Sequence, residues 1–338
     1  MDRGKGPRKW DIDGNEYVDY RTGHGSMILG QAHPAIVDAV QTQMAKGTHL
    51  SPCTEVEIRW ASLIKQIVPS VEKVRFVSSG TEAVMMAFRI CRRFTGKEKI
   101  VKFADAFHGW SDAAYVTDPD TDAAYGIPSG TASSVINLPP HDLEAVENTL
   151  KSDDDIAAVV FQGNDVARPE FIRGLRELTE RMGVLLMIDE VVSGFRWSMS
   201  GCKGRYDVTP DVSAFAKILA GGLPGGAVGG RADILDVIGQ GGVRHPGTFN
   251  ANPLSAAAGA TRAPTFDRRA DCRNGRSVGG KTPGRNKRVD QLQMEFINQS
   301  MVESRGVHLS SSHQDSEIDF TVDKFEAALT EVRKTGAI

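Results

Sequence analysis

Three short segments carry residue types that could hold a phosphorylated ligand and act on it. The first is Ser-Ser-Gly-Thr-Glu at residues 78–82, between an expected strand and an expected helix. Small residues let a ligand approach the backbone, and hydroxyls together with the first N–H groups of a helix suit a phosphate. A helix cap followed by a turn would use the same residues. Phosphate binding and helix capping therefore both stay open at this segment.

The second segment is an apolar run at residues 184–188 that ends in two carboxylates, Asp189 and Glu190. In sheets covered by helices on both faces, ligands sit beyond the carboxyl ends of the strands. A carboxylate there could face a protonated ring nitrogen or hold Mg²⁺. An ion pair at the sheet edge is the structural alternative.

The third segment places Lys217 between an apolar stretch at 211–216 and a glycine-rich stretch at 221–226. Partial desolvation would lower the pKa of its amine and make it a nucleophile for a Schiff base, whereas a surface lysine beside a loop is the commoner case. Lys217 follows Asp189 by 28 residues, which fits one strand–helix–strand step. We therefore expect both side chains at the same end of one sheet.

Two other motifs carry less information. Thr248, within residues 245–253, offers a hydroxyl beside a glycine, but alone this segment is typical of a turn. Residues 275–282 match the phosphate-loop pattern GxxxxGK[ST]. That loop needs a buried strand before it and a helix after it, and neither is indicated here. A nucleoside triphosphatase is therefore disfavoured.

The elements that must position these residues alternate along the chain. The pattern predicts a hairpin across 10–20, helices across 34–44, 55–68, 82–94, 143–150 and 170–182, and strands at 74–77, 100–103, 156–161, 184–188 and 213–216. Continuous apolar strands between helices indicate a mostly parallel central sheet covered on both faces. The predicted fold class is α/β.

Composition narrows the class of protein. Lys and Arg number 40 against 43 Asp and Glu in 338 residues, and the net charge of −3 does not favour nucleic acid or anionic membranes as partners. No apolar run approaches the roughly 18 residues that span a bilayer, and the N-terminus lacks a secretory pattern. Four scattered cysteines argue against a zinc cluster or a disulfide framework. We expect a cytoplasmic protein without nucleic-acid, membrane or metal partners.

Taken together and in order, these segments resemble the class III, fold type I, pyridoxal-phosphate-dependent aminotransferases. The likeness is strongest to the branch that contains glutamate-1-semialdehyde 2,1-aminomutase. It covers residues 10–260 and, more weakly, 305–335. The blocks that carry it are 10–20, 29–34, 79–83, 107–110, 188–191, 216–217 with the glycine stretch, and 247–253. No single block is decisive, but their common order makes chance improbable.

The resemblance implies pyridoxal 5′-phosphate as the cofactor and gives the matching residues roles. Lys217 would form the Schiff base with the cofactor and move the proton. Asp189 would pair with the protonated pyridine nitrogen, which makes the ring an electron sink. Ser79, Gly80 and Thr81 would hold the cofactor phosphate.

The resemblance also implies what surrounds the ring. Phe107 would stack on one face, Val191 would pack on the other, and His108 would flank it. Thr248 would reach the cofactor phosphate of the neighbouring subunit, so the resemblance implies a homodimer.

The chain departs from the family pattern in two places. Where the family usually has Glu-Pro after a central strand, this chain has Gln162-Gly163, and the loop that follows is contracted to 164–169. The small domain is reduced around 261–300. Both changes affect the substrate side of the site.

The pattern and the resemblance together divide the chain into four parts. Residues 1–50 are expected to form an N-terminal hairpin or arm and part of a small domain, and 51–260 the large cofactor-binding domain. Residues 261–290 hold nine Lys or Arg against three acidic residues and few apolar ones, and they are expected to form a mobile linker. Residues 291–338 would be the remnant of the C-terminal small domain.

Three functions stay open at the level of the sequence. The first is an aminotransferase that moves an amino group between an amino compound and a keto acid. The second is an aminomutase that moves the amino group within glutamate 1-semialdehyde, and the third is a shortened, non-catalytic relative that binds the cofactor. Arg21, His24 and Arg196 are candidates for a substrate-carboxylate clamp or, equally, solvated side chains.

Overall fold

The computed structural model describes residues 1–104, 106–116, 126–163, 169–196, 198–239, 242–261, 312–313, 316–317 and 319–320. The chain divides into two compact units, one formed by Met1–Asp38 with Arg262–Ile338 and the other by Ala39–Thr261. Residues 262–290 of the expected linker, which include its phosphate-loop pattern, lie outside the described residues, as do residues 164–168 of the contracted loop and most of 291–338.

The first unit begins with a three-stranded antiparallel sheet. Its elements are β1 (Arg3–Lys5), β2 (Arg8–Trp10), β3 (Glu16–Val18) and α1 (Thr22–Gly25), and α2 (Pro34–Met44) crosses the boundary between the units. The predicted hairpin is confirmed by the pairing of β2 with β3. The Asp11 carboxylate accepts hydrogen bonds from the backbone N–H groups of Asp13 and Asn15, which closes the turn between these strands.

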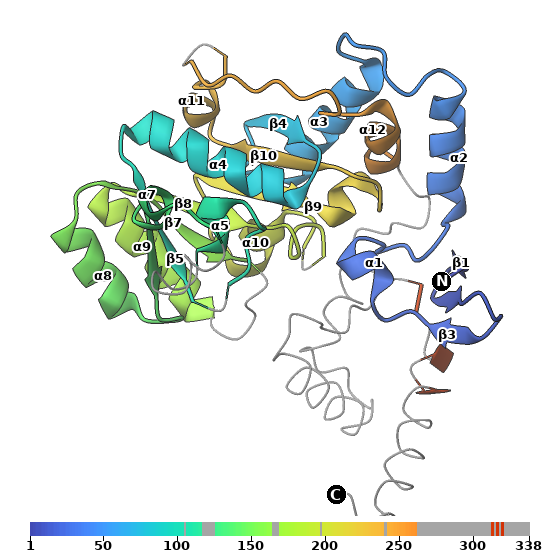
Figure 1. The fold of residues 1–338 in the computed structure, drawn as a ribbon, viewed down its shortest axis with the longest axis horizontal. Helices are drawn as coiled ribbons and strands as arrows, with labels where there is room; N and C mark the ends of the chain where they lie inside the picture. The colour runs from blue at the N-terminus through green and yellow to red at the C-terminus, as the bar shows by residue number, and fades with distance from the viewer. Residues whose placement is uncertain are drawn as a thin grey trace, which may run out of the picture. The chain divides into compact units, whose positions relative to one another are not determined.

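The second unit is built on a seven-stranded sheet (Figure 1). In spatial order its strands are β4 (Lys73–Val77), β10 (Gly226–Gly230), β9 (Val212–Ala216), β8 (Leu185–Asp189), β7 (Ile156–Gln162), β5 (Lys99–Phe103) and β6 (Val135–Leu138). β10 is antiparallel to both its neighbours, and every other pair in the sheet is parallel. The mostly parallel sheet that the sequence predicts is therefore confirmed.

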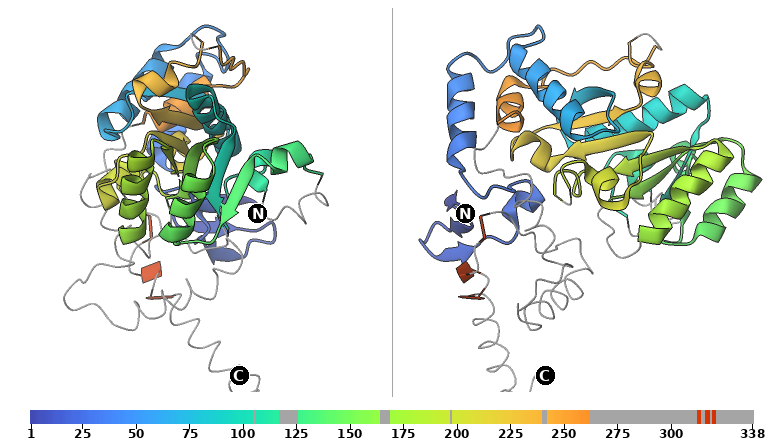
Figure 2. Two further views of the ribbon diagram at one scale, coloured as in Figure 1. Left: turned by 90° about the vertical axis from the view of Figure 1, so that its left-hand side faces the viewer. Right: turned by 180° about the vertical axis from the view of Figure 1, so that it is seen from behind.

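Helices cover both faces of this sheet (Figure 2). One face carries α4 (Gly80–Thr95), α5 (Asp112–Tyr115) and α11 (Ala232–Leu235), and the other carries α3 (Glu55–Ile67), α8 (Leu143–Ser152), α9 (Pro169–Met182), α10 (Gly201–Tyr206) and α12 (Pro253–Gly259). On β7, Ala158 and Val160 join the core under α4, while Val159 and Phe161 join the core under α9. Neighbouring residues of a strand face opposite sides, so a strand between two cores is apolar throughout.

Two strands of the sheet were not predicted. β6 is only partly buried apart from Val135, and β10 contains three glycines among its five residues. Glycine disfavours strands, so the sequence indicated only a glycine-rich stretch ending at Gly226. The structure places Gly226 in β10, where a Cβ would collide with the backbone carbonyl of Ser79, and Gly230 meets the carbonyl of Asp211 in the same way. Close packing of backbones explains these glycines.

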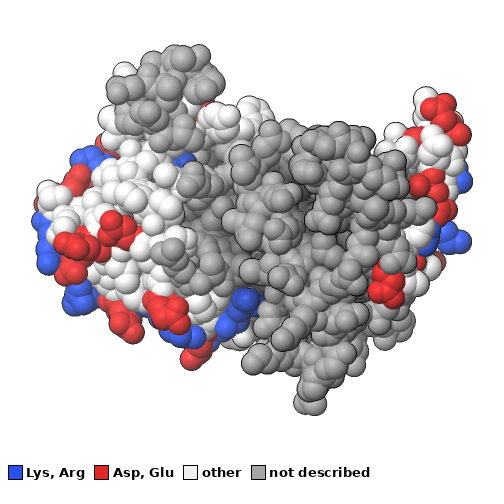
Figure 3. Space-filling view, turned by 90° about the horizontal axis from the view of Figure 1, so that it is seen from below, with Lys and Arg blue, Asp and Glu red and all other residues white. Residues whose placement is uncertain are grey.

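The described surface carries both signs of charge. Acidic and basic side chains lie interspersed over the described surface at the left of Figure 3. Among the described residues, no helix combines the length and the apolar character that crossing a membrane requires.

Two short helices remain to be named in the second unit. They are the α-helix α7 (Ser129–Ala132) and the 3₁₀ helix η2 (Lys217–Ala220).

Gly226→Ala is expected to lower the free energy of unfolding by about 1–3 kcal/mol, because the new Cβ would meet backbone rather than a movable side chain. Gly130→Ala in α7 is the matched control, since no atom of the described residues lies within 4 Å of a Cβ built there. The control should match or slightly exceed wild-type stability. Denaturant unfolding followed by circular dichroism measures both, and equal stability of the two variants would contradict the packing described here.

Candidate active site

The parallel strands end at one edge of the sheet (Figure 1), and the predicted site residues other than Thr248 lie at or follow strand ends in the chain. Gln162 at the end of β7 pairs with Asp189 at the end of β8, and Asp189 pairs with Ala214 of β9. Lys217 follows β9 directly. Lys217 and Asp189 therefore lie at the same end of neighbouring strands, as their spacing predicts.

The Asp189 carboxylate is buried, and two donors fix its orientation. Oδ1 accepts a hydrogen bond from the backbone N–H of Val191 (2.9 Å), and Oδ2 accepts one from Nδ1 of His108 (2.8 Å). Asp189 is 4% exposed and His108 is 1% exposed. A buried carboxylate without partners would be costly, so these bonds both stabilise it and hold it in one orientation. Nε2 of His108 is buried and finds no hydrogen-bond partner among the described residues.

The backbone at Lys217 is strained, and the surroundings of its amine lower the pKa of that amine. Its φ of 54° lies in the left-handed region, which is strained for a residue with a side chain. The carbonyl of Leu219 in η2 accepts a hydrogen bond from Nε1 of Trp60 (3.1 Å), which anchors the segment after Lys217. The pKa of the Lys217 amine is lowered, chiefly because the amine is buried. The Asp189 carboxylate raises this pKa, and the positive charge of Arg196 lowers it further. The nucleophilic form is thus easier to reach than for a solvated lysine.

Residues 79–81 begin α4, a helix of 16 residues. Ser79 caps it: Oγ accepts from the N–H of Glu82 (3.1 Å), and the Glu82 carboxylate accepts from the N–H of Ser78 (2.5 Å). The N–H groups of Gly80 and Thr81 lie in the first turn, where the helix offers them no partner. A helix N-terminus of this kind favours an anion. Capping and phosphate binding, the two alternatives for this segment, are compatible.

Close contacts bring residues 79–81 against the other segments of the site. A Cβ on Gly80 would lie 3.0 Å from Val191 and 3.4 Å from Cβ of Ala216, the residue before Lys217. A Cβ on Gly109 would lie 2.8 Å from Oγ1 of Thr81. The start of α4 therefore touches the segments that carry Asp189, Lys217 and His108.

Phe107 lies beside the buried pair of His108 and Asp189. It is 57% exposed, and its carbonyl accepts a hydrogen bond from Nε2 of Gln162 (3.2 Å). Gln162, which stands where the resemblance expects a glutamate, is therefore in contact with the segment that carries the predicted ring-stacking residue.

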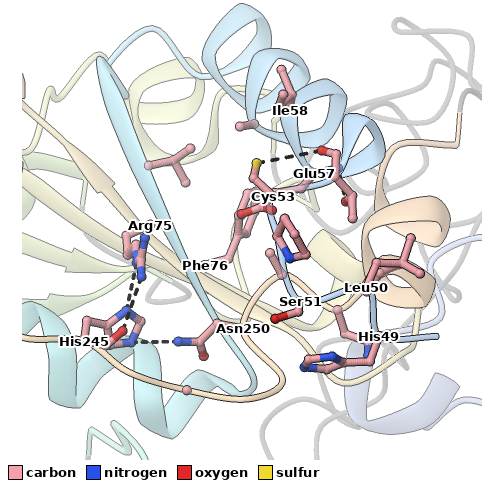
Figure 4. Close-up of a pocket in the computed structure, with 18 of the residues that line it drawn as sticks. His49, Leu50, Ser51, Cys53, Glu57, Ile58, Arg75, Phe76, His245 and Asn250 are labelled. Carbon is pink, nitrogen blue, oxygen red and sulfur yellow. Dashed lines mark hydrogen bonds between the residues drawn. The ribbon is translucent and has the colours of Figure 1, made fainter. Parts of the chain in front are cut away.

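Thr248 lies elsewhere in the second unit. It lines a cavity of about 560 Å³, whose walls come from within 49–54, 57–65, 74–76 and 245–253 (Figure 4). Nε2 of His49 lies 2.8 Å from the Thr248 carbonyl oxygen. Lys217, Asp189 and residues 79–81 do not line this cavity. The structure thus does not bring Thr248 into one cavity with the other predicted residues.

Arg75 of β4 makes two hydrogen bonds to His245, in the loop that leads to Thr248 (Figure 4). Nε of Arg75 donates to Nδ1 of His245 (2.9 Å), and Nη2 donates to the His245 carbonyl (3.2 Å). Burial lowers the pKa of His245, and the positive charge of Arg75 adds to the effect. A neutral imidazole accepting from Arg75 therefore holds this loop against β4.

Glu190 is a buried residue for which the sequence indicated no separate role. Its carboxylate accepts hydrogen bonds from the N–H of Cys202 (2.7 Å) and from Oγ of Ser193 (2.9 Å). Burial raises the pKa of Glu190 to about 7. Its position directly after Asp189 was the available signal, and its contacts tie the segment after β8 to the start of α10.

The three candidates for a carboxylate clamp fall in different parts of the chain. Arg196 is buried in the second unit, and burial lowers its pKa to about 10. Arg21 and His24 belong to the first unit, at helix α1. Of these three candidates, only Arg196 is placed by the structure relative to Lys217. The positive charge of Arg196 lowers the pKa of Lys217.

A family model described as aminotransferase class-III matches residues 1–316. The chain belongs to the class-III aminotransferase family. Its cofactor is therefore pyridoxal 5′-phosphate, in line with the resemblance found in the sequence.

Curated relatives of this class-III protein include two aminomutases. It is 43% identical over 272 residues to the glutamate-1-semialdehyde 2,1-aminomutase of Roseiflexus castenholzii, which covers 76% of this chain and 63% of the relative. It is 35% identical over 391 residues to glutamate-1-semialdehyde 2,1-aminomutase 2 of Bacillus pumilus, which covers 99% of this chain and 91% of the relative. The first match thus spans less than two thirds of the relative's length.

Solved transaminases share the fold of this class-III chain. The ω-transaminase from Sphaerobacter thermophilus is 31% identical with a TM-score of 0.80, over 98% of this chain and 90% of that one. A transaminase with PLP bound is 27% identical with a TM-score of 0.83, over 99% and 91%. The fold is that of the fold type I enzymes.

The residues at the sheet edge fit this cofactor. The free N–H groups at the start of α4 suit its phosphate, the fixed Asp189 carboxylate suits a protonated ring nitrogen, and Lys217 suits its aldehyde. Gly80 leaves no side chain where Val191 and Ala216 approach. Within the described ranges, no group of three or more His, Cys, Asp or Glu side chains could hold a metal ion.

Glu190→Gln is expected to flatten the pH dependence of stability. The raised pKa, about 7 against 4.5, means that the folded protein binds the Glu190 proton more tightly than the unfolded chain. Below pH 4.5, protonated Glu190 makes its full contribution to the free energy of unfolding. This contribution is lost as the pH rises through 7, and the free energy of unfolding falls by about 2 kcal/mol between pH 5 and 8. Glutamine keeps the acceptor for Cys202 and does not titrate.

Denaturant unfolding of both proteins at pH 5 and pH 8 measures this difference. Wild type should lose more stability between the two pH values than Glu190→Gln does. The same loss in both proteins would show that Glu190 does not titrate as its burial implies.

Proposed function

We propose that this chain is a pyridoxal-phosphate-dependent aminotransferase that moves an amino group between an amino compound and a keto acid. The observation that carries the proposal is the placement of Lys217, Asp189 and the start of α4 at one edge of the sheet. The cofactor supplies an aldehyde that an amine can attack and a ring that accepts electrons when a proton leaves the neighbouring carbon.

The residues at this edge have separate tasks. Lys217 binds the cofactor through its amine and moves the proton of the transfer, which its lowered pKa favours. Asp189 keeps a proton on the ring nitrogen, and its two donors prevent the carboxylate from turning away. The N–H groups of Gly80 and Thr81 bind the phosphate, beside the capping hydroxyl of Ser79.

The remaining predicted residues enclose the ring and complete the site. Phe107 and Val191 cover its two faces and exclude water, and His108 flanks it. Thr248 binds the cofactor phosphate of the neighbouring subunit in a homodimer. The separation of Thr248 from Lys217, Asp189 and residues 79–81, which do not line its cavity, supports a role outside its own subunit's site.

Intramolecular transfer on glutamate 1-semialdehyde is the second candidate. The 43% identity to the Roseiflexus castenholzii aminomutase favours it. The same Lys217 and Asp189 would serve, but the enzyme would have to keep its intermediate bound until the second half of the reaction.

Lys217→Ala is expected to abolish the absorbance of covalently held cofactor and to lower the turnover number by more than about 1000-fold, because both the attachment point and the proton carrier are lost. Borohydride should fix the cofactor irreversibly to wild type and not to the variant. Absorbance spectra before and after dialysis measure both effects.

Lys151→Ala on the exposed side of α8 is the matched control, since Lys151 pairs with Glu147 on the surface. This variant should behave like wild type. If wild-type protein with added pyridoxal phosphate shows no absorbance band of bound cofactor, the proposal is contradicted.

Conversion of glutamate 1-semialdehyde without any added amino donor separates the candidates. An aminotransferase should turn over amino compounds repeatedly only when a keto acid is supplied, because without it each enzyme molecule completes a single half-reaction. Product formation from the semialdehyde alone would establish the aminomutase instead. Bound cofactor with no half-reaction across a panel of amines would identify a shortened, non-catalytic relative.

A further inference from the structure

The end of β7 carries a residue pair to which the proposed function gives no role. The resemblance found in the sequence leads us to expect Glu-Pro here, whereas this chain has Gln162-Gly163. Each residue of the pair donates one hydrogen bond, Gln162 to the Phe107 carbonyl and Gly163 to the Asp189 carbonyl. Glu-Pro could make neither bond at neutral pH, because a carboxylate only accepts and proline has no N–H.

The Gln162 amide fixes the backbone just before the donor of Asp189. Its Nε2 lies 3.2 Å from the Phe107 carbonyl oxygen. His108 is the next residue, and its Nδ1 lies 2.8 Å from Oδ2 of Asp189. A shift of the Phe107 carbonyl would therefore move the imidazole that orients the carboxylate.

Gly163 ties the same strand end to the backbone of Asp189. Its N–H lies 2.8 Å from the Asp189 carbonyl oxygen. A Cβ at this position would lie 3.1 Å from that oxygen and 3.1 Å from Sγ of Cys202. A side chain at this position would require Ser193, Cys202 or the Asp189 backbone to shift, so the hydrogen bond and the close packing both fix this end of the strand.

We propose that Gln162 is a positioning residue, whose side-chain amide holds the Phe107–His108 segment in place for the cofactor ring and for Asp189. A glutamate would turn an oxygen toward the Phe107 carbonyl. It would also stand next to Asp189 in register, on the same face of the sheet, and so place two negative charges side by side. The catalytic meaning of this positioning rests on the proposed function, but the anchoring itself does not.

Gln162→Glu and Gln162→Ala test the anchor, and Gln66→Glu, on the exposed side of α3, controls for the added charge. In cofactor-free protein, both Gln162 variants should speed amide hydrogen exchange at residues 106–111 by about 2- to 10-fold at pH 8, as the loss of one net hydrogen bond allows. Cofactor binding should weaken by a similar factor. The control should match wild type in both measurements.

The two variants should differ in pH dependence. Protonation of the introduced carboxylate restores an O–H donor, so the exchange ratio of Gln162→Glu to wild type should fall toward 1 between pH 8 and pH 5. The ratio for Gln162→Ala should stay constant. Wild-type exchange in both variants at pH 8, or the same pH trend in both, would overturn the proposal. Wild-type protein that binds no cofactor would contradict the proposed function and leave the exchange test valid.

Discussion

The geometry of the site depends on one buried carboxylate, that of Asp189. Asp189 ends a strand whose other residues are apolar, so its side chain must find donors within the protein. One donor, the N–H of Val191, comes from the turn that the strand itself enters. The other, His108, comes from the segment after β5, two strands away in the sheet. Orientation of one charge thus joins two loops that are distant in sequence.

Close packing against glycines makes the site compact. Glycines at 80, 109 and 226 stand where a Cβ would meet Val191, Thr81 and the Ser79 carbonyl. These contacts bring the start of α4 against the ends of the neighbouring strands. The same compactness buries the Lys217 amine and lowers its pKa, so packing and reactivity have a common origin.

The sequence predicted the sheet and the edge that carries the site, because apolar periodicity and strand ends are local features. It did not predict β10, since three glycines hide a strand whose reason is the packing of its neighbours. The bond between His108 and Asp189 joins residues 81 positions apart, and no local pattern indicates which donor reaches a buried carboxylate. The donor role of Gln162 likewise became visible only when the Phe107 carbonyl was placed beside it.

The ring nitrogen of the bound cofactor offers the most direct measurement. Protein loaded with pyridoxal 5′-phosphate labelled with ¹⁵N in the ring can be compared with Asp189→Asn by nitrogen NMR, with Asp207→Asn on the surface as the control. We expect a protonated ring nitrogen in wild type and in the control, and a deprotonated one in Asp189→Asn. A ring nitrogen in the same protonation state in all three proteins would contradict the pairing of Asp189 with the cofactor.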